Sequence, residues 1–135
     1  MGHKMRILIA EDDLASRIFM KKFLSRYGDC DIAVNGLEAL DAFLGALKEE
    51  NPYNLICLDI MMPKLDGLKA AKAIRDIEQQ KGIEGEARTK IIMTTALNDK
   101  TTIKNAYDAG CEAYAWKPIE IDKFLIVMGK LGLIK

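Results

Sequence analysis

Groups able to bind a metal ion and a phosphoryl group follow short apolar runs at four places in the sequence. An acidic stretch occupies 11–13, and Asp59, Thr95 and Lys117 add a carboxylate, a hydroxyl and an ammonium. Two carboxylates about 4 Å apart repel each other by about 4 kcal/mol at an effective dielectric constant of about 20. A site that gathers several carboxylates therefore needs a cation, and oxygen ligands with open coordination positions favour Mg²⁺.

A carboxylate placed beside such a cation and a lysine is equipped to attack a phosphoryl group. The metal and Lys117 would stabilise the phosphoryl oxygens, and Thr95 could donate a hydrogen bond to one of them. These residue types therefore indicate phosphoryl transfer to a carboxylate.

Each of these groups also has a purely structural interpretation. Asp12 or Asp13 could cap the helix that follows, and Asp59 could cap a turn. Thr95 could be a buried strand residue, and Lys117 could be an ordinary solvated lysine. The structural interpretations weaken together, because independent caps have no reason to gather at one edge of a sheet.

The elements that must position these groups alternate along the chain. Short, nearly continuous apolar runs predict strands covered on both faces, at 7–10, 30–34, 55–58, 91–94 and 113–116. Stretches with apolar residues three and four apart predict helices at 14–27, 37–47, 68–77, 103–107 and 121–128. This alternation predicts an α/β fold, with one doubly wound, five-stranded parallel sheet that has helices on both faces. Ligands bind to such sheets at the carboxyl ends of the strands.

Length and composition limit the range of functions. The 135 residues, 50% of them hydrophobic, are enough for one compact domain. The 20 basic and 20 acidic residues cancel, which argues against bulk binding to nucleic acid or to a membrane surface. No apolar run reaches the roughly 20 residues that span a bilayer. Three separated cysteines are typical of buried side chains in a reducing compartment, so we expect a cytoplasmic protein.

The ordered motifs resemble those of response-regulator receiver domains in bacterial two-component signalling, over nearly the whole chain. The motifs are the acidic stretch 11–13, Asp59 through Asp66-Gly67 with Met62-Pro63 between them, Thr95-Ala96 and Lys117-Pro118. The resemblance implies a (βα)₅ flavodoxin-like, CheY-like fold with strand order 2-1-3-4-5. We expect the receiver domain over 6–133, an N-terminal extension at 1–5 and no effector domain; the polar stretch 79–89 would be a helix end and a surface loop.

The resemblance also implies a role for each residue of the site. Asp59 would accept a phosphoryl group from a partner histidine kinase or phosphotransfer protein. Asp13 and Asp59, with the backbone carbonyl of Met61, would hold Mg²⁺, and Asp12 would act mainly through metal-bound water. Lys117 would contact the phosphoryl group. The chain would be a signalling switch and not an enzyme, catalysing only its own Mg²⁺-dependent phosphotransfer and dephosphorylation.

The resemblance further implies a conformational switch. Thr95 would move towards the phosphoryl group, and Tyr114 would turn inward to fill the vacated space. The surface formed by the last two predicted helices and the last strand would then signal to a downstream protein. The last helix carries additional apolar residues that would either pack more deeply or form a docking or dimer surface; they are Ile126, Val127, Leu131, Leu133 and Ile134.

Two apolar positions bear on the lifetime of a phosphorylated state. Met61 and Leu97 stand where receiver domains often carry polar groups that orient a hydrolytic water. We therefore expect slow hydrolysis of the aspartyl phosphate.

Two other functions compete: a degenerate receiver used only for binding, and an enzyme or flavin carrier on a similar fold. The acidic stretch 11–13 would repel a flavin phosphate, and a haloacid-dehalogenase-type phosphatase would need an aspartate at Met61.

Overall fold

The computed structural model describes residues 4–135 as five strands and five helices, with one short 3₁₀ turn. The strands are β1 (Met5–Ala10), β2 (Gly28–Ala33), β3 (Leu55–Asp59), β4 (Lys90–Thr95) and β5 (Ala113–Trp116). The helices are α1 (Leu14–Leu24), α2 (Gly36–Lys48), α3 (Gly67–Gln80), α4 (Lys100–Asp108) and α5 (Ile121–Lys130). The 3₁₀ turn η1 spans Gly85–Ala87.

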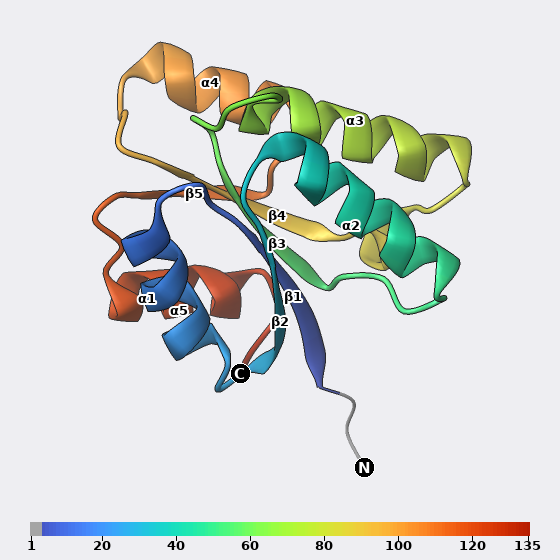
Figure 1. Ribbon diagram of the computed structural model, residues 1–135, viewed down its shortest axis with the longest axis horizontal. Helices are drawn as coiled ribbons and strands as arrows, with labels where there is room; N and C mark the ends of the chain where they lie inside the picture. The colour runs from blue at the N-terminus through green and yellow to red at the C-terminus, as the bar shows by residue number, and fades with distance from the viewer. Residues whose placement is uncertain (1–3) are drawn as a thin grey trace.

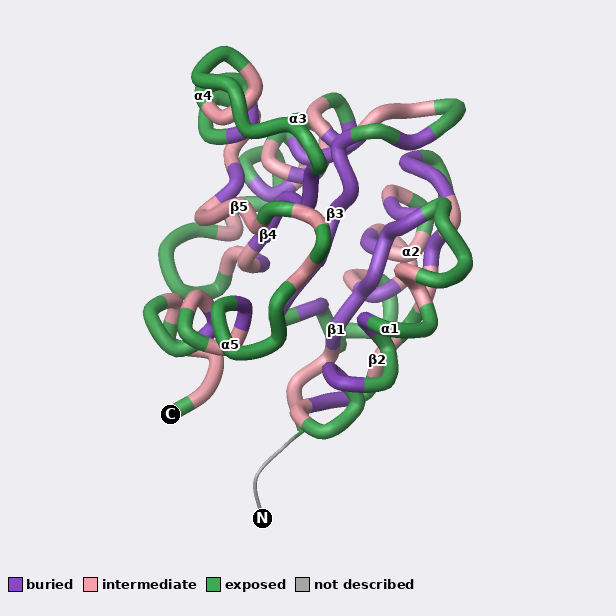
Figure 2. The backbone as a smooth tube through the Cα atoms, turned by 90° about the vertical axis from the view of Figure 1, so that its left-hand side faces the viewer, coloured by how far each residue is buried: buried purple, intermediate pink, exposed green. Residues whose placement is uncertain are grey.

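All five strands form one parallel sheet in the order β2-β1-β3-β4-β5, which confirms the predicted fold class and strand order. Helices α1 and α5 lie on one side of this sheet, and α2, α3 and α4 lie on the other (Figure 1). Each side has its own apolar core. Figure 2 shows the buried residues concentrated along β1, β3 and β4, as expected for strands covered on both faces.

Side-chain caps start four of the five helices. The carboxylate or amide oxygen of the residue before each helix accepts a backbone N–H three residues later, which satisfies one orphan donor of the first turn. These N-cap residues are Asp13, Asn35, Asp66 and Asp99 for α1 to α4 in turn. The caps fix where each helix leaves the carboxyl edge of the sheet, and so they position the loops that carry the polar groups.

The element boundaries differ a little from the sequence-based expectations. Helix α1 ends at Leu24 and not at Tyr27, because the chain turns there to enter β2 at Gly28. Residues 1–3 of the expected N-terminal extension lie outside the described residues, and Met5 already belongs to β1. No helix in the described range 4–135 has the length and apolar character needed to cross a membrane.

The apolar residues of the last helix and tail largely pack inward. Val127, Leu131, Leu133 and Ile134 pack against the core beneath α1 and α5, whereas Ile126 is 58% exposed. Packing therefore accounts for most of the additional apolar residues. The three cysteines are free thiols; Cys57 and Cys111 are buried and Cys30 is half-buried.

The polar stretch 79–89 is fastened at its C-terminal end by a group of ion pairs that we call the Arg75 network. Arg75 binds Glu78 at 2.6 Å and Glu112 at 2.7 Å, and Arg88 also binds Glu112, at 2.9 Å. The backbone N–H of Thr89 donates to the second oxygen of Glu78 at 2.8 Å. Glu78 is only 2% exposed. The expected helix end and loop are present, but the network ties the loop to α3 and to the start of β5.

Candidate functional site

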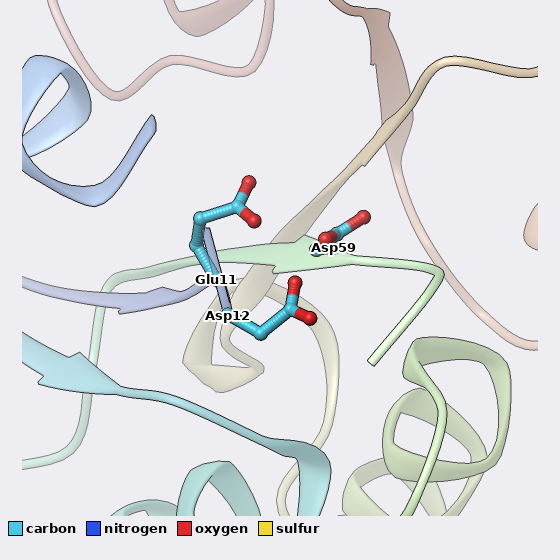
Figure 3. Close-up of side chains that lie close together, drawn as sticks. All are labelled: Glu11, Asp12 and Asp59. Carbon is cyan, nitrogen blue, oxygen red and sulfur yellow. The ribbon is translucent and has the colours of Figure 1, made fainter. Parts of the chain in front are cut away.

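Three carboxylates gather at the carboxyl edge of the sheet. Glu11 and Asp12 directly follow β1, and Asp59 is the last residue of the neighbouring strand β3. One oxygen from each side chain lies within 4.8 Å of the others. Figure 3 shows the three side chains at the ends of these two strands. The carboxylates are therefore close enough to bind one ion together.

Lys117 links two of these carboxylates. Its Nζ lies 2.5 Å from Oε1 of Glu11 and 3.1 Å from Oδ2 of Asp59. Both acidic residues are nearly inaccessible to solvent, with 3% and 4% exposure, whereas Asp12 is exposed. With three carboxylates and one ammonium, this cluster carries excess negative charge that a divalent cation would balance.

Burial and mutual repulsion disturb the titration of the cluster. Burial, followed by the charge and hydrogen bond of Glu11, raises the pKa of Asp59 to about 7 against the opposing effect of Lys117. Burial alone would lower the pKa of Lys117, but its contacts with Glu11 and Asp59 outweigh burial and raise that pKa. The ammonium therefore stays charged at neutral pH. A cation bound at the cluster would favour the ionised form of Asp59.

The structure corrects the expected position of Asp13. Its side chain does not join the cluster; it accepts the backbone N–H of Ser16 at 2.9 Å as the N-cap of α1. That bond lowers the pKa of the exposed Asp13 carboxyl. Glu11 takes the third place in the cluster, and sequence reasoning missed it. One signal was available: Asp13 directly precedes the predicted helix 14–27, and aspartate is a preferred residue at that N-cap position.

The loop after β3 holds Asp59 through backbone contacts. The N–H of Met61 donates to Oδ1 of Asp59 at 3.3 Å, while the Met61 side chain is 65% exposed. The loop then folds back, and the N–H of Gly67 donates to the carbonyl of Ile60 at 2.9 Å. A Cβ at Gly67 would overlap the carbonyl oxygen of Asp59, so only glycine fits this close approach.

The two residues expected to switch lie on adjacent strands, β4 and β5. Thr95 is 1% exposed, and its Oγ1 accepts the N–H of Leu97 at 2.9 Å, which leaves the hydroxyl proton free to donate. Tyr114 is half-buried and packs against the core beneath α2, α3 and α4. The backbone N–H of Lys117 donates to the carbonyl of Thr95 at 2.8 Å, which ties the ends of β4 and β5 together.

The sequence is similar to those of known signalling proteins. Residues 7–128 match the sequence profile of the response regulator receiver domain. The chemotaxis protein CheY of Bacillus subtilis is 32% identical over 132 residues, covering 96% of this chain and 98% of that protein. Probable histidine kinase 2 of Oryza sativa subsp. indica is 34% identical over 126 residues, covering 86% of this chain but only 12% of the kinase.

Solved structures share the fold. The receiver domain of the response regulator Ssk1 from Saccharomyces cerevisiae, crystallised with the histidine phosphotransfer protein Ypd1, has a TM-score of 0.78 and 30% identity. The match covers 93% of this chain and 86% of that one. Given the profile match, these relatives and the acidic edge of the sheet, this chain belongs to the receiver-domain family of two-component signalling.

Proposed function

We propose that this chain is a Mg²⁺-dependent phosphoacceptor switch in which Asp59 receives a phosphoryl group from a phosphohistidine. The observation that carries the proposal is the setting of Asp59 at the end of β3. Its buried carboxylate lies 3.1 Å from the Lys117 ammonium and within 4.8 Å of two further carboxylates. This arrangement offers a nucleophile, a fixed positive charge and a set of ligands for a cation.

The acidic cluster fits a magnesium ion. Asp12 and Asp59, with the backbone carbonyl of Met61, would hold the ion directly, because Glu11 is already engaged by Lys117 at 2.5 Å. Glu11 would then act through a metal-bound water. The bound ion would offset the negative charge of the incoming phosphoryl oxygens.

The transfer itself breaks one bond and forms one. A carboxylate oxygen of Asp59 attacks phosphorus, the phosphorus–nitrogen bond to the donor imidazole breaks, and its electron pair stays on that nitrogen. Lys117, which contacts both Glu11 and Asp59, would exchange its bond to Asp59 for one to a phosphoryl oxygen. The free hydroxyl proton of Thr95 would donate to a second oxygen.

The relatives support a proposal for the partners. The Ssk1 receiver domain was crystallised with a histidine phosphotransfer protein, which supports a histidine kinase or a phosphotransfer protein as the phosphodonor. Output would pass through the surface of α4, β5 and α5 to a downstream protein or to a second copy of the chain. Thr95 and Tyr114 would couple the site to that surface. The chain then acts as a signalling switch that catalyses only its own phosphorylation and dephosphorylation.

Incubation with acetyl phosphate tests the proposal. With Mg²⁺, intact-mass measurement should show a gain of one phosphoryl group, and EDTA should prevent the gain. Peptide mapping should place the group on the segment that contains Asp59. The competing function, a receiver used only for binding, gives no mass gain, and that result would overturn the proposal.

Substitutions at the acidic stretch separate a metal ligand from a helix cap. Asp12→Asn should weaken Mg²⁺ binding by about tenfold or more, because it removes a charged ligand from the cluster. Asp13→Asn should leave Mg²⁺ affinity within about twofold, since asparagine keeps the cap on α1 and Asp13 lies outside the cluster. Calorimetric titration with Mg²⁺ measures both affinities. Equal losses in the two variants would contradict the assignment.

The phosphorylated protein should be long-lived without an external phosphatase. Met61 and Leu97 are 65% and 47% exposed and apolar, so neither can hydrogen-bond a water for attack on phosphorus. We expect a lifetime of minutes or longer with Mg²⁺ alone, measured by the decay of the mass gain. Met61→Asn should shorten it by about tenfold or more. Ile126→Asn, at a similarly exposed position on α5, is the control; a wild-type lifetime of seconds refutes the prediction.

A further inference from the structure

We propose that Tyr107 and Trp116 are positioning residues that hold the ring of Tyr114 in its resting place and so set how readily the switch turns. The proposal rests on the proposed function and adds regulation to it. Tyr107 lies on α4, and Trp116 lies two residues after Tyr114 on the same face of β5. We call these two side chains the aromatic bracket.

The rings of the bracket contact Tyr114 from two directions. The ring of Tyr107 lies edge-on to that of Tyr114, with centroids 5.9 Å apart and an interplanar angle of 84°. The ring of Trp116 is tilted by 48° with a centroid separation of 5.8 Å. Both separations fall in the range of favourable aromatic pairs. In the proposed switch, the Tyr114 ring turns inward and gives up both contacts.

The strand register connects the bracket to the site. Thr95 of β4 is paired with Trp116 of β5, and Met93 is paired with Tyr114. Residues paired in a parallel register point to the same face of the sheet, so Thr95, Tyr114 and Trp116 share one face. A movement of Thr95 towards Asp59 therefore opens space on the face of the sheet that the Tyr114 ring occupies.

Substitutions in the aromatic bracket can change the position of Tyr114 without disturbing the core. Tyr107 and Trp116 are 47% and 51% exposed, so truncating either leaves the buried core intact. Removing one aromatic contact from the resting position should favour the inward position by about threefold to tenfold. Because a phosphoryl analogue binds best to the inward position, its apparent affinity should rise by the same factor.

Trp116 is the only tryptophan, so its fluorescence reports directly on the bracket. The probe is beryllofluoride with saturating Mg²⁺, as an analogue of the phosphoryl group. It should change the emission of the wild-type protein, and Tyr114→Ala should abolish the change while still gaining a phosphoryl group from acetyl phosphate. Tyr107→Ala should lower the half-saturating beryllofluoride concentration by about threefold to tenfold.

Two matched variants exclude a merely structural effect. Tyr107→Phe keeps the ring and should bind the probe within about twofold of wild type. Leu37→Ala truncates a side chain of similar exposure, 48%, on the distant helix α2 and should leave the midpoint unchanged. An unchanged midpoint in Tyr107→Ala, or a persisting emission change in Tyr114→Ala, would overturn this inference alone. Absence of any mass gain in the wild type would instead refute the proposed function, and this inference with it.

Discussion

Asp59→Asn should eliminate the mass gain from acetyl phosphate and, without metal, should make the protein more stable than wild type at pH 8. The first effect follows because an amide is neither the nucleophile nor the anionic ligand that the proposed transfer needs. The second follows from burial. The Asp59 carboxylate is 4% exposed and lies beside Glu11, and its pKa is raised to about 7.

The sign of the pH effect is fixed by that raised pKa. In the unfolded chain Asp59 ionises near pH 4, whereas in the folded chain it ionises near pH 7. Its neutral form stabilises the fold below about pH 4, and this contribution is lost as the pH rises to 7. Asparagine stays neutral, so the variant should gain roughly 1–3 kcal/mol over wild type by pH 8, after allowance for solvent screening.

Urea unfolding with EDTA from pH 4 to pH 8 measures the difference between the two proteins. Mg²⁺ should shrink the difference, because it binds the folded wild type at the acidic cluster. Asp66→Asn is the control, since asparagine caps α3 as well as aspartate does and lies outside the cluster. A stability difference that does not change with pH would show that the fold does not raise the pKa of Asp59. A full mass gain in Asp59→Asn would show that another residue accepts the phosphoryl group.

The fold could be predicted because its determinants are local. Five apolar runs of strand length alternate with helical patterns, and this alternation leaves few topologies that keep crossovers right-handed. The strand order itself came from the resemblance, because apolar patterning does not say which strand lies at the edge. The end of α1 was misplaced, since apolar spacing continues to Tyr27 although the helix ends at Leu24.

The site was predicted only in part, for a reason that the acidic stretch illustrates. Strand ends indicated Asp59, Thr95 and Lys117 correctly as neighbours of one edge, because parallel strands end together. Three consecutive carboxylates, however, leave open whether residues 11 and 12 or residues 12 and 13 join Asp59 in the cluster. The choice between Glu11 and Asp13 depends on which of them caps α1. That is a competition between local hydrogen bonds and cluster formation, and residue types alone do not decide it.

Contacts between distant segments could not be predicted from the sequence. Arg75 and Glu112 are 37 residues apart, yet both carboxylate oxygens of Glu112 accept from one terminal nitrogen of Arg75, at 2.7 and 2.9 Å. The ring of Tyr107 on α4 contacts the ring of Tyr114 on β5. In the sequence, Arg75, Tyr107 and Glu112 look like ordinary surface residues, because nothing in the sequence indicates the partners that the fold places beside them.

Arg75→Leu should lower the free energy of unfolding by about 3–5 kcal/mol, although it lies outside the site. The side chain of Arg75 is 13% exposed, and its guanidinium donates to both Glu78 and Glu112. It also donates to the carbonyls of Gly110 and Thr89, at 2.9 and 2.8 Å. Leucine would leave the carboxylate of Glu78, whose side chain is 3% exposed, without a cation. Uncompensated buried charge is the main cost.

Arg88→Leu is the matched control, because Arg88 binds the same Glu112 carboxylate at 2.9 Å from a 41% exposed position. An exposed ion pair contributes about 1 kcal/mol or less, so this variant should stay close to wild type. Urea unfolding of both variants at one pH measures the contrast. Restoring neutrality should rescue the first variant: Arg75→Leu combined with Glu78→Leu should recover part of the loss. If Arg75→Leu costs no more than Arg88→Leu, the network does not hold a buried charge.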